Sequence, residues 1–209
     1  MLASAFLDKS RNPGAWRKHA RALRRSANLL WDEFSKLLVE AAAGAKHNNA
    51  ELDLEAALEA LETTKLLYGL ALETALKARI VEHYPSKLEV RVAMDGTGQA
   101  THAELRAVGV SISNGHNLLA LAEAAELFGA DFQSVLRTED DKSVMRNICR
   151  DLAEVVLWRG RYPVPLTSAE QVRLDPKVPP QAMAHYMRDW LDKVLDALVE
   201  DRDESAMQK

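Results

Sequence analysis

Apolar residues recur along most of the chain at the three- and four-residue spacing that one face of an α-helix requires. Two long segments near the N-terminus carry this pattern, residues 13–43 and residues 51–82. Asn12 and Pro13 are typical of a helix start, and the first segment ends before Gly44. The second segment must end before a later proline, because the residue preceding proline disfavours helical geometry. The pattern predicts two long helices that pack as an antiparallel hairpin.

Three shorter helices are predicted further along the chain, over residues 116–128, 139–158 and 180–199. A glycine follows the first of them and is typical of a helix end. The second opens with Thr138 and Asp141 at the spacing of a capping box, in which side chain and backbone bond each other reciprocally. The third follows a proline-rich connection, which favours extended backbone before the helix begins.

The segment between the long helices and these shorter ones, residues 84–114, contains three glycines and only weak periodicity. We expect it to be an irregular insertion with a short helix at about residues 103–108. Only residues 90–92 alternate as a half-buried strand does. The sequence therefore predicts an all-α protein, with one domain over residues 1–209 and a C-terminal helix at about 180–200.

Two charged residues interrupt the most apolar stretch of the second long helix, residues 66–81. Glu73 and Lys77 fall on the same helical face as Leu70 and Ile80, so both charges lie on a stripe that should be buried. On an exposed surface such a pair contributes only about 0.2–0.5 kcal/mol, and stability alone does not account for it. Two interpretations stay open, a buried pair that ties the helices together and a part of a functional site.

A basic cluster occupies one face of the first long helix, where Arg17, Arg21 and Arg24 line up. Residues 192–204, near the other end of the chain, are rich in Asp and Glu, so we expect an electrically polar molecule. The net charge of −4 argues against a globally basic nucleic-acid binder, and any contact with a polyanion would depend on a local patch. The three arginines suit contact with a nucleic-acid backbone, and a solvated charged face is the alternative.

Composition bears on several other classes of protein. Cys149 is the only cysteine, which excludes an internal disulfide and a cysteine-based zinc site within one chain. The histidines are not spaced like metal ligands, so we predict no metal and no cofactor. No apolar run is long enough for a membrane-spanning helix, and the N-terminus lacks the pattern of a secretory signal. We therefore expect a cytoplasmic protein without a membrane contact.

Three short motifs follow one another in the chain. They are Leu70-Ala71-Leu72-Glu73 with Lys77, then Gly115-His116-Asn117-Leu118, and then the residues from Trp158 through Pro163. In their order and residues these motifs resemble those of bacterial HEPN-domain proteins of the RYP-containing kind, and the resemblance covers residues 66–165. The resemblance implies a bundle of four to five helices, frequent homodimers, and membership of toxin–antitoxin or phage-defence systems. It also implies a range of functions, from metal-independent RNA cleavage to the binding of a nucleotide or a partner protein.

Ribonuclease members of that family place an arginine and a histidine on a late helix with four to six residues between them, and this chain has no such pair. Its residue types still suit phosphodiester chemistry, which needs proton transfer and cations beside the phosphate. His116 would transfer the proton, while Arg159 and Arg161 would bind the phosphate. The supporting or ligand-binding residues would be Glu73, Lys77 and Tyr162.

The same residues suit a phosphate pocket without catalysis. Our first expectation is a non-enzymatic HEPN-like module that forms a homodimer and binds a nucleotide, RNA or a cognate protein, such as an antitoxin or a defence protein. The alternatives are a metal-independent endoribonuclease that acts as a toxin-like effector and a generic helical scaffold protein. For a functional site, five residues from three separate segments should converge in one pocket. They are Glu73, Lys77, His116, Arg159 and Arg161.

Overall fold

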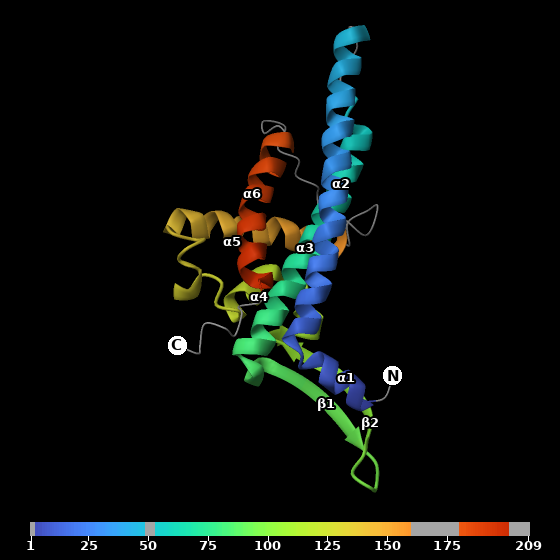
Figure 1. Cartoon of the computed structure of the whole chain (residues 1–209), viewed down its shortest axis with the longest axis vertical. Helices are drawn as coiled ribbons and strands as arrows, with labels where there is room; N and C mark the ends of the chain where they lie inside the picture. Colours follow the sequence, from blue (N-terminus) through green and yellow to red (C-terminus); the bar gives the residue numbers. More distant parts are fainter. Residues whose placement is uncertain (1–2, 49–52, 160–179, 201–209) are drawn as a thin grey trace, which may run out of the picture.

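The computed structural model describes residues 3–48, 53–159 and 180–200, which form six α-helices and a small antiparallel sheet. Two long helices dominate this architecture, α2 (Pro13–Asn48) and α3 (Glu55–His83). They pack side by side and antiparallel, and their upper ends project above the rest of the molecule (Figure 1). The predicted helical hairpin is confirmed.

Helix α2 is longer than predicted, because it continues through Gly44 instead of ending there. Its apolar positions face the core, where Trp31 and Phe34 are almost fully buried and meet edge to face. A part-buried hydrogen bond connects the two long helices, in which the hydroxyl of Tyr68 donates to Oδ1 of Asn28 over 2.6 Å. Burial raises the pKa of Tyr68 to about 12, so this hydroxyl keeps its proton at physiological pH.

Helix α3 is the central element of the fold. Every residue from 71 to 81 is buried, because α2 covers one side of the helix and other elements cover the rest. These elements are α4 (Leu118–Ala124), α5 (Glu139–Glu154) with the π-helical turn that follows it (Val155–Arg159), and α6 (Pro180–Val199). A helix that is apolar on all sides belongs inside a fold. Any charge on this part of α3 is therefore inside as well.

The predicted irregular insertion at 84–114 is wrong, because these residues form a small sheet. Strand β1 (Leu88–Met94) pairs antiparallel with β2 (Ala100–Val108). A two-residue strand β3 (Val110–Ser111) follows and pairs antiparallel with the end of β2. The short helix expected near 103–108 is likewise replaced by strand β2. The fold is mostly helical with a peripheral β-hairpin rather than all-α, and the sheet extends from the lower end of the bundle (Figure 1).

The pairing explains why the residues of this segment favour strands. Val90 opposes Leu105 and Val92 opposes Ala103, so the apolar side chains of both strands share one face. Irregularities in the register lie between Glu89 and Val90 and again near the hairpin tip, and they break the two-residue period. Gly109 makes the turn into β3 with a positive φ of 74°, and its α-carbon packs closely against α3.

The remaining helices agree with the sequence in position and differ in length. Helix α4 is shorter than the predicted 116–128, and its cap is the side chain of Asn117, which accepts from the backbone of Ala120. The capping box that opens α5 is confirmed, with Thr138 and Asp141 bonding each other reciprocally. Helix α6 matches its prediction. Helix α1 (Ala3–Ser10), which was not predicted, packs against β2.

None of the helices in the described ranges has both the length and the apolar composition that crossing a bilayer requires.

Candidate functional site

The two charges on the apolar face of α3 form a buried ion pair. Nζ of Lys77 donates to Oε1 of Glu73 over 2.6 Å, one helical turn away. Each side chain keeps only 9 % of its surface exposed. Both charges have lost most of their hydration, which costs several kcal/mol per ion unless other groups replace the lost water contacts. The pair is therefore part of the interior and unlike the weak salt bridges of a surface helix.

His116 completes this cluster from a distant part of the chain. Its Nδ1 lies 2.8 Å from Oε2 of Glu73, so the two carboxylate oxygens serve two different partners. A carboxylate only accepts hydrogen bonds, which places a proton on Nδ1 and leaves Nε2 of the neutral ring as an acceptor. The side chain of His116 is 36 % exposed, whereas Glu73 and Lys77 are covered. The imidazole is therefore the part of the cluster that meets solvent.

The loop that carries His116 is fitted closely over Lys77. Gly115 is buried, and a β-carbon built on it would lie 3.5 Å from Nζ of Lys77 and 3.1 Å from the backbone oxygen of Ile112. A β-carbon at this position would crowd the backbone oxygen of Ile112 and lie in van der Waals contact with Lys77. Asn117 follows as the N-cap of α4 and fixes the direction in which the chain leaves. The sequence thus positions His116 between a glycine that allows close approach and a helix start that holds the backbone.

The π-helical turn at the end of α5 packs against the same stripe of α3. A β-carbon on Gly69 would lie only 2.5 Å from Cγ2 of Val156, so this contact depends on glycine. Gly69 precedes Glu73 by one helical turn. The backbone of Arg159 ends the described part of this turn. The side chain of Arg159, and all of Arg161 and Tyr162, lie outside the described residues.

The structure thus joins three of the five residues expected in one pocket, Glu73, Lys77 and His116. Sequence reasoning missed a third charge in the same apolar helix, Arg79, whose Nε donates to the backbone oxygen of Ala125 over 2.8 Å. Its guanidinium also bonds Asp131 over 2.7 Å and covers the ring of Phe132. The signal that pointed to Glu73 and Lys77, a charge within an apolar stretch, applies equally to this arginine.

The arginines of α2 are engaged by acceptors within the chain. Arg24 binds Asp192 at 2.9 Å and Asp196 at 2.5 Å, both on α6. Arg21 donates to the backbone oxygen of Val199 at 2.9 Å, at the end of the same helix. Acidic side chains of α6 thus lie against the basic face of α2. This reduces the positive charge that the face offers to a nucleic-acid backbone.

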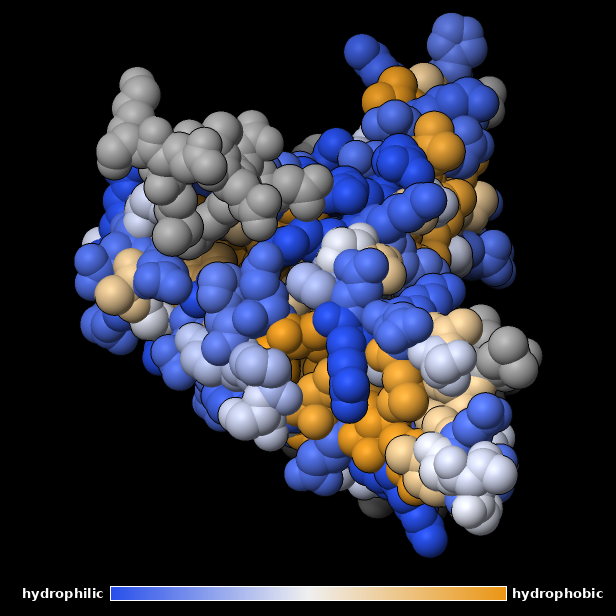
Figure 2. Space-filling view, turned by 60° about the horizontal axis from the view of Figure 1, so that its bottom comes forward, coloured by the Kyte–Doolittle hydropathy of each residue, from blue (hydrophilic) through white to orange (hydrophobic). Residues whose placement is uncertain are grey.

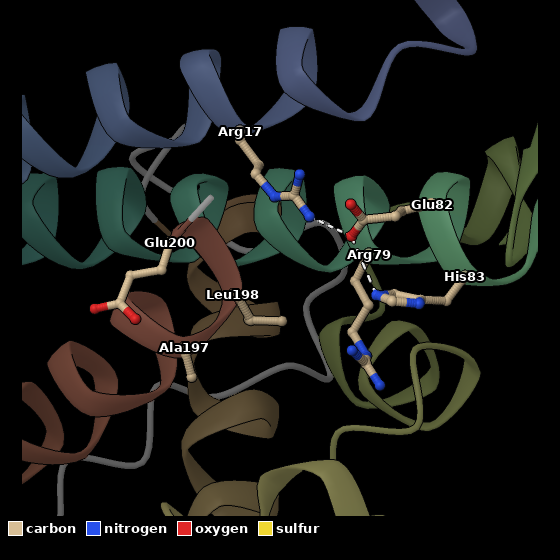
Figure 3. Close-up of a pocket in the computed structure, with 7 residues that line it drawn as sticks. All are labelled: Arg17, Arg79, Glu82, His83, Ala197, Leu198 and Glu200. Carbon is tan, nitrogen blue, oxygen red and sulfur yellow. Dashed lines mark hydrogen bonds and ion pairs between the residues drawn. The ribbon is translucent and has the colours of Figure 1, made fainter. Parts of the chain in front are cut away.

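Arg17 is engaged in a similar way at the lower end of the long hairpin. It forms an ion pair with Glu82 of α3, and Nε2 of His83 lies 3.1 Å from the same carboxylate (Figure 3). Arg79 and the residues at the end of α6 close the space beside them (Figure 3). The enclosed volume is about 20 Å³, which is enough for about one water molecule. This charged cavity lies between α2, α3 and the end of α6, and it is too small for an organic ligand.

Comparisons of the chain with protein families, with curated proteins and with solved structures found no match. The cluster of Glu73, Lys77 and His116 is therefore interpreted from its geometry.

Within the described ranges, no group of three or more His, Cys, Asp or Glu side chains is arranged to hold a metal ion. Burial raises the pKa of Cys149 to about 12, which keeps this thiol protonated and unreactive at neutral pH.

Proposed function

We propose that the protein is a non-enzymatic, HEPN-like helical module that binds a phosphate-bearing ligand, RNA or a nucleotide, at His116. The observation that carries this proposal is the chain of contacts from Lys77 through Glu73 to His116. Glu73 balances Lys77, so protonation of the imidazole gives the cluster a net positive charge at its exposed end. An anion on the solvent side would then receive a charge-assisted hydrogen bond from Nε2.

The course of α5 supports a role for the arginines that follow it. Asp151 of α5 lies 3.7 Å from Lys65 of α3, and Val156 packs on Gly69, one turn closer to Glu73. The end of α5 therefore advances along α3 toward the charged cluster. We assign Arg159 and Arg161 the role of phosphate ligands on this basis, because one planar guanidinium group can donate to two oxygens of the same phosphate.

Fluorescence polarisation with a labelled single-stranded RNA, and calorimetry with AMP, test this assignment. We expect His116→Ala to weaken binding of at least one of these probes by about five- to tenfold, as loss of one charge-assisted hydrogen bond would. The midpoint of thermal unfolding should stay close to that of the unaltered protein, because the ring is partly exposed. His47→Ala, at an exposed position of α2, is the matched control and should bind normally. The proposal would be contradicted if the unaltered protein bound neither probe, or if His116→Ala and His47→Ala bound the probes equally well.

One observation favours RNA cleavage as the second candidate function. The hydrogen bond to Glu73 leaves Nε2 of His116 free to accept a proton, which a general base for the ribose 2′-hydroxyl must do. This requires no metal ion. Incubation with RNA would then yield fragments that end in 2′,3′-cyclic phosphates, and His116→Ala would abolish them while RNA binding persisted. Intact RNA after prolonged incubation would leave binding as the function.

We also propose that the protein forms a homodimer through the projecting part of the long hairpin. Leu29 and Val39 of α2 are 72 % and 69 % exposed, and both lie on the helix that extends beyond the rest of the bundle. Exposed apolar side chains on a protruding element favour association. Light scattering at micromolar concentration should show twice the chain mass, and Leu29→Glu combined with Val39→Glu should give the monomer. A monomer before substitution would refute this assignment.

A further inference from the structure

A second candidate site lies at the lower end of the molecule, and its lining residues do not include Glu73, Lys77 or His116. Helix α1, the first turns of α2 and strand β2 surround a groove of about 790 Å³. Phe6, Trp16 and Leu105 are the large apolar residues that line it, one from each element. The volume lies within the range of small-molecule pockets, which are mostly apolar with a few polar groups. Figure 2 shows this end of the molecule, where a broad hydrophobic surface is bordered and crossed by hydrophilic side chains.

The charges at this groove differ from the other charges on α2. Arg17, Arg21 and Arg24 follow one face of the helix and bind acceptors within the chain. Lys18 and His19 lie on the opposite face, where they line the groove together with Lys9 of α1. In the described part of the chain, the side chains of these three residues form no hydrogen bond or ion pair. Among the described residues, none that lines the groove is acidic. Its charge is complementary to an anion.

Two neutral polar groups of the groove, on Ser10 and Trp16, are already engaged. The hydroxyl of Ser10 donates to the backbone oxygen of Leu7 over 2.9 Å. The indole nitrogen of Trp16 donates to the backbone oxygen of Ser10 over 3.0 Å. The lining side chains therefore offer apolar surface and two lysine charges, and among the described lining residues His19 is the one neutral polar side chain without a hydrogen bond. This combination favours a hydrocarbon chain with an acidic end over a nucleotide.

We propose that this groove binds a free long-chain carboxylate. The hydrocarbon chain lies against Phe6, Trp16 and Leu105, and the carboxylate is held by the lysines of α1 and α2. Burial of each methylene contributes about 0.8 kcal/mol, so affinity rises with chain length. Lys9 and Lys18 add attraction for the anionic end and select against a cation of the same length. This site is independent of His116 and of any ligand bound there.

Calorimetry with dodecanoate, below the concentration at which it forms micelles, tests the proposal. We expect saturable binding of one dodecanoate per chain and no comparable binding of dodecyltrimethylammonium, which has the same hydrocarbon chain and the opposite charge. Lys9→Glu combined with Lys18→Glu should weaken binding by about five- to tenfold, the effect of replacing two attractive surface charges with repulsive ones. The matched control, Lys36→Glu combined with Lys46→Glu, reverses two exposed charges of α2 outside the groove and should bind normally.

A second variant tests the position of the hydrocarbon chain. Ala22 lines the groove, and Ala22→Trp would fill it from α2 without changing a charge. We expect this variant to lose dodecanoate binding and to keep the thermal midpoint of the unaltered protein within a few degrees. Three results would overturn the proposal: no saturable binding, equal binding of the cationic analogue, or undiminished binding by both groove variants. His116→Ala should leave dodecanoate binding unchanged, so failure here is distinguishable from failure of the RNA or nucleotide site.

Discussion

Removal of the carboxylate of Glu73 should destabilise the protein more than any other single change in the buried cluster. Glu73→Gln removes the negative charge beside Lys77 and His116 and leaves one amide oxygen where two carboxylate oxygens accept hydrogen bonds. Among the described residues, Glu73 is the only hydrogen-bond acceptor found for the ammonium of Lys77, which is 9 % exposed. The substitution therefore leaves a charge inside the fold without a counter-ion.

The expected magnitude follows from this burial. Breaking a buried ion pair by removal of one partner costs about 3–5 kcal/mol. For a chain of this size, each kcal/mol lowers the thermal midpoint by about 2–4 °C, so Glu73→Gln should lower it by roughly 6–20 °C. Lys77→Met should cost less, because the carboxylate keeps its hydrogen bond to His116, and this ring is able to take up a proton.

The assay is a double-mutant cycle in urea, followed by far-ultraviolet circular dichroism. The cycle compares Glu73→Met and Lys77→Met, made singly, with the double variant, which replaces both charges with apolar side chains of similar length; Glu73→Gln is measured beside it. Because well-packed apolar residues often match or exceed a buried pair, the double variant should recover most of the stability lost by either single variant. A loss below about 1 kcal/mol for Glu73→Gln would show that water reaches the pair. Strictly additive losses in the double variant would show that the two charges do not interact.

Three further predictions concern the packing, the charges and the thiol. Gly69→Ala should cost about 1–3 kcal/mol in urea unfolding, because its β-carbon would meet Val156, whereas Gly44→Ala, with no neighbouring atom within 4 Å, should gain about 0.5–1 kcal/mol. Arg24→Gln should lower stability by about 1–2 kcal/mol by removing the arginine that Asp192 and Asp196 of α6 share, and this loss should shrink in high salt. Cys149 should resist thiol reagents at pH 8 until the protein unfolds. Since its folded pKa exceeds the unfolded value of about 9, stability should also fall as pH rises above 9, because only the unfolded thiol loses its proton there.

The parts of the fold that local pattern determines were predictable from the sequence. The periodicity of α2 and α3 extends over many turns, so their pairing followed from the apolar faces alone. The reciprocal bonds of Thr138 and Asp141 involve residues three apart, and the sequence contains that spacing directly. Glu73 and Lys77 were recognisable because charged residues rarely interrupt a helix that is apolar on every side.

The other parts depend on contacts between distant residues. Strand β2 is rich in alanine and favours a helix locally, and its conformation follows from pairing with β1. Asp192 lies 168 residues from Arg24, so no local pattern shows that these charges neutralise each other. His116 reaches Glu73 across 43 residues, and only the resemblance to a family motif brought the two together before the structure did. The roles of Arg159 and Arg161 stay predictions.

The π-helical turn at Val155–Arg159 is a position where evolution could redirect the chain by gain or loss of one residue. Such a turn contains one residue more than an α-helical turn, and one residue rotates the following backbone by about 100° around the helix axis. Leu157 is 43 % exposed, so loss of that single codon would restore α-helical geometry with little loss of core packing. The direction in which the chain leaves α5 would then change relative to Glu73. Insertions and deletions of one residue here would diversify the surroundings of the charged cluster while the helical core stayed the same.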